Sequence, residues 1–274
     1  MADRQRTATF ARYSRVGSLL AAAGALAAAL PATIVSVSGM SSMHAIQAMF
    51  VLYALIACAS GFVYHGLPKA LATDVQQPMA PLQQSKKTIY ALAALFSLDA
   101  FAGGFVVQSM VALWLYQRFD LSMAAAGVVF FWTGVLTAAS YLVAVRVAGR
   151  FGLVNTMVFT HIPSSLCLIL LPFVPDLSWA IALLFVRSAL SQMDVPTRSS
   201  YVMAIVTPAE RPAAASITSV PRSLAAAMSP FLAGYMLGLS TFGWPLLVAG
   251  GVKIVYDLLL LAMFRKIRPP EEED

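Results

Sequence analysis

Eight long apolar stretches run along this 274-residue chain and decide the solvent in which it can fold. They cover residues 16–36, 43–64, 89–115, 123–145, 153–174, 178–206, 212–238 and 243–264, and each is near or above the roughly 20 residues that a helix needs to cross a bilayer. Charged residues make up only 11% of the chain, whereas a soluble domain has about a quarter. A soluble fold of this size cannot bury so much apolar surface. We therefore expect an all-α polytopic membrane protein with about eight transmembrane helices.

The longest break lies between the second and third stretches. Residues 65–88 are rich in Pro, Gln and Lys and lack helical periodicity, which predicts a cytoplasmic linker. The chain then divides into a pair of transmembrane helices within 1–64, the linker, a six-helix transmembrane bundle at 89–266 and an acidic cytoplasmic tail at 267–274. The first stretch follows four arginines and also fits a cleaved signal peptide, although it is long for one and a second stretch follows almost at once.

Basic residues outside the apolar stretches indicate the orientation. Thirteen of them fall on one side of an eight-span arrangement and only Arg118 falls on the other. The thirteen are Arg4, Arg6, Arg12, Arg15, Lys69, Lys86, Lys87, Arg146, Arg150, Arg211, Arg265, Lys266 and Arg268. Lys and Arg are concentrated in cytoplasmic loops, so both termini are predicted to be cytoplasmic. The net charge of +6 reflects these loops and does not indicate nucleic-acid binding.

Charged residues inside the stretches are the candidates for function. Asp99, Arg187, Arg222 and Lys253 each lie nine or ten residues into their spans. At 1.5 Å per residue this is about 15 Å, the middle of a hydrocarbon core of about 30 Å. A charge there costs at least about 2.5–3.5 kcal/mol if it faces lipid. We expect these four side chains to converge near the midplane, each paired with a partner or facing a water-filled cavity.

The sixth stretch has a polar face. On a continuous helix Arg187, Asp194 and Arg198 would lie within about 40° of one another. Pro196 cannot donate a backbone hydrogen bond, which would leave the carbonyl of Gln192 free and bend the helix. Asp194 and Arg198 are favoured as a structural ion pair at i, i+4, and Arg187 as a cavity-lining residue.

The other buried charges allow two interpretations each. Asp99 is either a proton carrier or the permanent counter-ion of an arginine, and Arg222 either lines a cavity or pairs with an acid. Lys253 and Asp257 are i, i+4 partners and are predicted to neutralise each other, whereas His161 is predicted to be hydrogen-bonded packing. The sequence contains no metal-ligand cluster, phosphate loop or nucleophile–base pair, so neither enzymatic activity nor a metal or cofactor is expected.

The stretch RSALSQMDVPTRSSYVMAIVTPAERPAAASITSVPRSLAAAMSPFLAGYM, residues 187–236, resembles the tenth and eleventh helices of bacterial major facilitator superfamily transporters. The P-x-E-R loop, followed by a small-residue helix with an S-P break, is its most specific part. The resemblance covers essentially the whole chain and matches the last eight of the family's twelve helices, arranged as two bundles of six. It implies a complete C-terminal bundle, part of an N-terminal bundle, and missing N-terminal helices. The start, RTATFARYSRVGSLL, resembles the loop that enters the fifth helix.

The resemblance implies secondary active transport of a small solute by alternating access, with proton-coupled efflux across a bacterial cytoplasmic (inner) membrane. The third, sixth and seventh spans would border the cavity and the eighth would be peripheral. The predicted pathway residues are Asp99, Arg187, Asp194, Arg198 and Arg222. The expected partners are the solute and the lipid bilayer, not nucleic acid. The alternative is a non-transporting membrane protein in which these charges form a permanent structural network.

Overall fold

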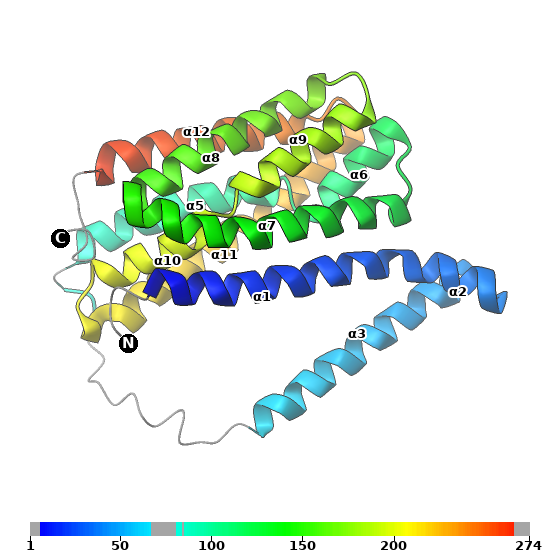
Figure 1. Ribbon diagram of the computed structural model, residues 1–274, viewed down its shortest axis with the longest axis horizontal. Coiled ribbons are helices and arrows are strands. Elements are labelled where there is room, and N and C mark those ends of the chain that lie inside the picture. Colours follow the sequence, from blue (N-terminus) through cyan, green and yellow to red (C-terminus); the bar gives the residue numbers. More distant parts are fainter. Residues whose placement is uncertain (1–5, 67–80, 84, 266–274) are drawn as a thin grey trace.

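The computed structural model describes residues 6–66, 81–83 and 85–265. All regular secondary structure in these residues is helical (Figure 1). The helices are α1 (Arg6–Leu26), α2 (Leu30–Ser38), α3 (Ser42–His65), α5 (Lys86–Gly104), α6 (Gln108–Phe119), α7 (Met123–Phe151), α8 (Leu153–Leu170), α9 (Leu177–Leu190), α10 (Asp194–Ala204), α11 (Arg211–Leu239) and α12 (Trp244–Phe264), with the 3₁₀ turns η2 (Ala27–Ala29), η3 (Leu171–Phe173) and η4 (Pro208–Glu210). The predicted acidic tail and most of the predicted linker lie outside the described residues.

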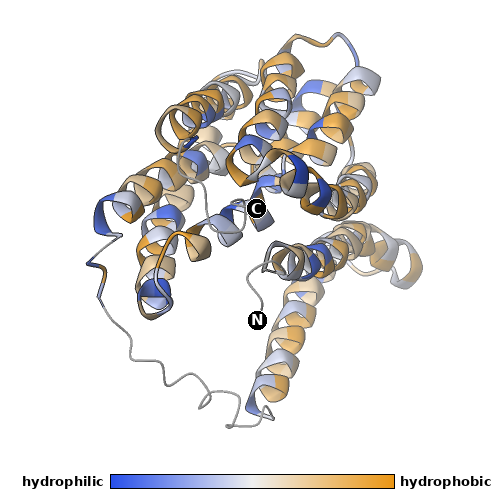
Figure 2. Cartoon of the chain, turned by 60° about the vertical axis from the view of Figure 1, so that its left-hand side comes forward, coloured by the Kyte–Doolittle hydropathy of each residue, from blue (hydrophilic) through white to orange (hydrophobic). Residues whose placement is uncertain are grey.

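Every predicted stretch is mostly helical, which confirms an all-α polytopic membrane protein. Among the described residues, six segments are long and apolar enough to cross a membrane: residues 7–38, 42–65, 86–119, 123–151, 153–173 and 244–264. The remaining two predicted spans correspond to α9 with α10, and to α11. The first of these is broken in the middle, and the second contains Pro221 and Pro230 together with Arg222. Figure 2 shows that hydrophobic residues predominate along the helices.

Three predicted helix boundaries are corrected by the structure. The predicted loop at the start of the chain is helical from Arg6, and this first segment continues through η2 and α2 to Ser38. The third predicted span is interrupted at residues 105–107, directly after Gly103 and Gly104. The sixth is interrupted at residues 191–193, just before Pro196. Gly and Pro weaken helices locally, which explains both interruptions.

Helices α5 to α12 pack into one bundle. The most extensive contacts pair α5 with α11 and α8 with α12, and α12 also packs against α5. Two apolar clusters fill the bundle. One surrounds Phe96, Met157 and Tyr256, and the other surrounds Trp114 and Leu168. Asp99, His161 and Lys253 lie between the residues of these clusters along α5, α8 and α12, so the buried charges form a polar layer between two apolar ones.

The N-terminal helices attach to this bundle through α1, which runs along α7 and also contacts α10 (Figure 1). Glycines on α7 allow the close approach, because a Cβ at Gly127 would lie 2.6 Å from the carbonyl oxygen of Ala25, and one at Gly134 would lie 2.6 Å from the Cβ of Ala22. Helix α3 contacts α2 and diverges from the bundle, and only Ala45 along it is buried.

Candidate functional site

Asp99 on α5 lies at the centre of a buried group of charges. Its Oδ2 accepts a hydrogen bond from Arg198 Nη1 at 2.9 Å, and its Oδ1 accepts one from Lys253 Nζ at 2.6 Å. All three side chains are at least nine-tenths buried. Of the two interpretations of Asp99, the contacts match the counter-ion, with a lysine as well as an arginine as partner.

The ion pair within α10 is confirmed. Arg198 Nη2 lies 2.7 Å from Asp194 Oδ2, one turn away on the same helix. The same guanidinium bridges Asp194 and Asp99 and stacks over the ring of Phe96 at 5.4 Å. The five N–H donors of a guanidinium lie in one plane and point in different directions, so a single guanidinium can bind two carboxylates at once. Arg198 therefore joins α10 to α5.

The predicted Lys253–Asp257 pair is wrong. Lys253 reaches across to Asp99 on α5, and the carboxylate of Asp257 accepts from Nδ1 of His161 on α8, at 2.9 and 3.0 Å. Nε2 of His161 lies 3.3 Å from Lys253 Nζ, and this contact joins the His161–Asp257 pair to the Lys253–Asp99 pair. Residues one turn apart on a helix can pair, but here α5 supplies a carboxylate to Lys253 and α8 supplies an imidazole to Asp257. The prediction that His161 is hydrogen-bonded and buried is confirmed.

These contacts form one buried network that runs in the order Asp257, His161, Lys253, Asp99, Arg198, Asp194. Sequence reasoning missed the roles of His161, Lys253 and Asp257 in it. Their depth in the spans was a usable signal, because all three lie in the middle of long apolar helices. The helix-to-helix pairing had no local signal.

The network borders a cavity of about 280 Å³, here called the network cavity. Its lining includes Arg222 of α11 and five members of the network: Asp99, His161, Asp194, Arg198 and Lys253. Arg222 has an exposed side chain, and the structure records no ion pair for it among the described residues. Of its two interpretations, the cavity-lining one fits the geometry.

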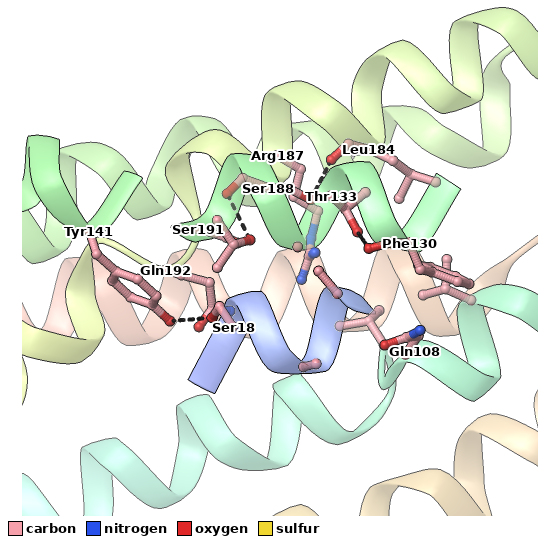
Figure 3. Close-up of a pocket in the computed structure, with 16 residues that line it drawn as sticks. Ser18, Gln108, Phe130, Thr133, Tyr141, Leu184, Arg187, Ser188, Ser191 and Gln192 are labelled. Atoms are coloured by element: carbon pink, nitrogen blue, oxygen red, sulfur yellow. Dashed lines mark hydrogen bonds between the residues drawn. The ribbon is translucent and has the colours of Figure 1, made fainter. Parts of the chain in front are cut away.

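A second cavity, of about 270 Å³, lies between α1, α7 and α9 (Figure 3). It is here called the Arg187 cavity, because that side chain extends from α9 toward α1. Its other polar lining residues are Ser18, Gln108, Thr133, Tyr141, Ser188, Ser191 and Gln192. The Nε of Arg187 is buried and has no hydrogen-bond partner among the described residues.

The predicted convergence of four charges at one point is therefore only partly correct. Asp99, Arg222 and Lys253 border the network cavity, whereas Arg187 lines the neighbouring one. The separation follows from the break at residues 191–193, since Arg187 and Asp194 no longer share a continuous helix. The two cavities meet at this break, because Ser191 and Gln192 line both.

The break also corrects a backbone prediction. The carbonyl of Gln192, expected to be free, accepts from the N–H of Val195 at 3.3 Å. The amide of Ser191 still donates to the carbonyl of Arg187 at 2.8 Å, so α9 keeps its last hydrogen bond. The turn thus satisfies the carbonyl within the backbone, as a membrane-spanning segment requires.

Comparisons with known proteins agree with this architecture. The family model described as Major Facilitator Superfamily matches residues 92–274. The chain is also 23% identical to a Saccharomyces cerevisiae protein described as uncharacterized membrane protein YJR124C, over 94% of this chain and 66% of that protein. The chain thus spans slightly less than two thirds of this relative. No solved structure matches the chain.

Proposed function

The chain belongs to the major facilitator superfamily, and from this premise we propose that it mediates secondary active transport of a small solute by alternating access. The multi-pass helical architecture supports this proposal, as do the two polar cavities within the membrane-spanning segments. Polar residues within membrane-spanning helices usually face a water-filled cavity or the interior of the bundle rather than lipid. Transporters bind their substrates near the middle of the bilayer.

The observation that carries the proposal is the unpaired Nε of Arg187. A guanidinium has five N–H donors, and a buried donor without a partner costs about 1–3 kcal/mol. The side chain extends into a cavity that also contains hydroxyl and amide groups from Thr133, Tyr141 and Gln192 (Figure 3). A solute with a carboxylate or another anionic group would satisfy the donor that the protein leaves free.

The remaining predicted residues would border the solute pathway from the other side of the helix break. Asp99, Asp194 and Arg198 compensate one another there, and Arg222 adds a cation that the described contacts leave unpaired. The break between α9 and α10 connects the two cavities, so a movement of α10 would reach both.

We further propose that the transport is proton-coupled efflux across a bacterial cytoplasmic membrane, with both termini in the cytoplasm. Buried carboxylates and a histidine within membrane-spanning helices support proton coupling, because such groups are rare there and mark ion pathways. The basic residues outside the spans support the orientation, and the start of α1 and the end of α12 lie at the same end of the bundle (Figure 1). The outward direction follows the resemblance to bacterial family members.

Transport in proteoliposomes tests the proposal. The purified protein would be reconstituted with a pH-sensitive dye inside the vesicles, under an imposed proton gradient, and offered small organic anions, neutral compounds and cations. Arg187→Ala should lower anion transport about tenfold or more, because a hydrogen bond to a charged group contributes about 1.5–3 kcal/mol. Arg146→Ala is the matched control, since Arg146 is an exposed arginine on α7 that bonds only a backbone carbonyl of its own helix.

Equal anion transport by the Arg187→Ala and Arg146→Ala variants would show that Arg187 does not bind the solute. A wild-type protein that moves none of the solutes, and is stabilised by none of them against heat, would refute transport. That result would instead support a non-transporting membrane protein with a permanent charge network.

A further inference from the structure

The buried network contains one more carboxylate than permanent cation. Its acids are Asp99, Asp194 and Asp257, and its cations are Arg198 and Lys253. None of these five side chains belongs to a residue more than 8% exposed. An uncompensated charge is costly at this depth, so a further buried positive charge would stabilise the network. Arg222 lines the same cavity, but it is exposed and forms no ion pair with these acids among the described contacts. The sixth member, His161, is the group that can supply this buried charge by binding a proton.

The contacts of His161 match a ring that is protonated on Nδ1. A lysine ammonium has donors and no acceptor, so Nε2 of His161, 3.3 Å from Lys253 Nζ, accepts from it. The proton of the neutral ring then lies on Nδ1, which donates to Asp257. In this arrangement the ring carries one proton, and Nε2, which faces Lys253, is the nitrogen that a second proton would occupy.

A proton on Nε2 would break this arrangement. Nε2–H and the ammonium of Lys253 would both be donors, so their contact could not persist. The nearest carboxylate oxygen is Oδ1 of Asp99, 3.8 Å from Nε2, and it is the same oxygen that Lys253 holds at 2.6 Å. The protonated ring would compete with Lys253 for Asp99.

This competition would reach the helix break between the two cavities. Oδ2 of Asp99 binds Arg198, and the other side of that guanidinium binds Asp194, the first residue of α10. A change in how Asp99 is held therefore changes the restraint on the start of α10. That start follows directly on residues 191–193, two of which line both cavities.

We propose that Nε2 of His161 is the proton-binding atom of this protein, and that its protonation is linked to the solute cavities through Lys253, Asp99, Arg198 and Asp194. Asp257 is a positioning residue, because its bond to Nδ1 fixes the tautomer. The role in coupling rests on the proposed transport function. The proton site replaces Asp99 as the predicted proton carrier, since Asp99 is held between two cations.

Several positive charges lie near His161: Lys253 and Arg198 belong to the network, and Arg222 lines the same cavity. The charged and titratable residues on the helices that pack against α8 are Lys253, Tyr256 and Asp257 on α12, Asp194, Arg198 and Tyr201 on α10, Arg187 on α9, and Tyr141, Arg146 and Arg150 on α7. Tyr256 meets the imidazole edge-on at 6.0 Å, and its hydroxyl has no partner among the described residues. Arg222 on α11 lines the network cavity, and Arg187 lines the other cavity.

Nuclear magnetic resonance of the imidazole tests the proton site directly. The chain has three histidines, so selective ¹⁵N and ¹³C labelling gives a simple spectrum, and His161→Gln identifies the His161 signals. In wild-type protein in lipid nanodiscs, His161 should be a neutral ring protonated on Nδ1 at high pH and should gain a proton on Nε2 as the pH falls. An imidazole that stays neutral over the whole pH range in which the protein is folded would overturn the proposal.

A transport measurement tests the coupling separately. His161→Gln keeps a hydrogen-bonding side chain but cannot bind the proton, so proteoliposomes with this variant should lose solute-dependent proton movement and retain solute movement. His44→Gln is the matched control, because His44 is exposed on α3 and bonds only Ser41. Unchanged proton movement in His161→Gln would overturn the coupling. If wild-type protein moves no solute, the transport function fails, while the titration of His161 still decides the proton site.

Discussion

Replacing Asp99 by asparagine should destabilise the protein because it removes the carboxylate that compensates Lys253. Arg198 keeps Asp194 at 2.7 Å, but Asp99 is the only acid within ion-pair distance of Lys253 in the described structure. Removing one partner of a buried ion pair costs about 3–5 kcal/mol. Asparagine still offers one carbonyl oxygen, which favours the lower end, about 3 kcal/mol. For a chain of this size, that corresponds to a fall of about 6–12 °C in the unfolding midpoint.

A double-mutant cycle isolates the ion pair. Adding Lys253→Met to Asp99→Asn removes the stranded cation and fills its space with an apolar chain of similar length, so most of the lost stability should return. Thermal unfolding in one detergent, followed by intrinsic tryptophan fluorescence, would compare the wild type, both single variants and the double variant. Asp120→Asn is the matched control, because Asp120 is exposed and has φ 53°, a conformation that asparagine tolerates.

The reasoning would be refuted if the double variant were no more stable than Asp99→Asn. The same conclusion would follow if Asp99→Asn lowered the unfolding midpoint no more than Asp120→Asn. Either result would mean that Lys253 does not depend on Asp99 for compensation.

Two further predictions concern glycines, one at the contact between α1 and α7 and one at the N-cap of α12, and both are checked by the same unfolding measurement. Gly127→Ala should cost about 1–3 kcal/mol, since its Cβ would lie 2.6 Å from the carbonyl oxygen of Ala25 and push α1 away from α7. Gly149→Ala on the same helix has nothing within 4 Å and should be neutral or stabilise by up to about 1 kcal/mol, and equal effects at the two sites would contradict the close approach. Gly243→Ala should cost about 2 kcal/mol, because the backbone there has φ +99° and the new Cβ would lie 2.7 Å from Nε1 of Trp114. A Gly243→Ala variant as stable as wild type would show that neither the strain nor the contact is present.

The helices and their membrane character could be predicted from the sequence because they depend on local pattern. A run such as 123–145 is apolar over its whole length, and backbone groups in lipid must be satisfied within the helix. The pair Asp194–Arg198 was predictable for the same reason, since i, i+4 neighbours share a helix face whatever surrounds them. The bend before Pro196 was predictable because proline lacks a backbone donor, whereas the interruption after Gly104 was less so, because glycine is tolerated within many membrane helices.

The partners of the other charges could not be predicted in this way. Lys253 has Asp257 one turn away, yet it binds Asp99, which is 154 positions earlier in the chain. The choice depends on how α5, α8 and α12 are rotated about their axes, and that rotation is set by the packing of Phe96, Met157 and Tyr256 across the bundle.

By itself, the sequence determined that this chain is a helical membrane protein and that several charges lie deep within its spans. Both conclusions follow from hydrophobicity and from the fixed rise of a helix, which are properties of each segment alone. Only the tertiary structure decided that Arg187 lines one cavity while the other charges form a network that includes His161 and Asp257. Ion pairs between helices depend on distance and direction in three dimensions, and these are properties of the packed bundle rather than of any one segment.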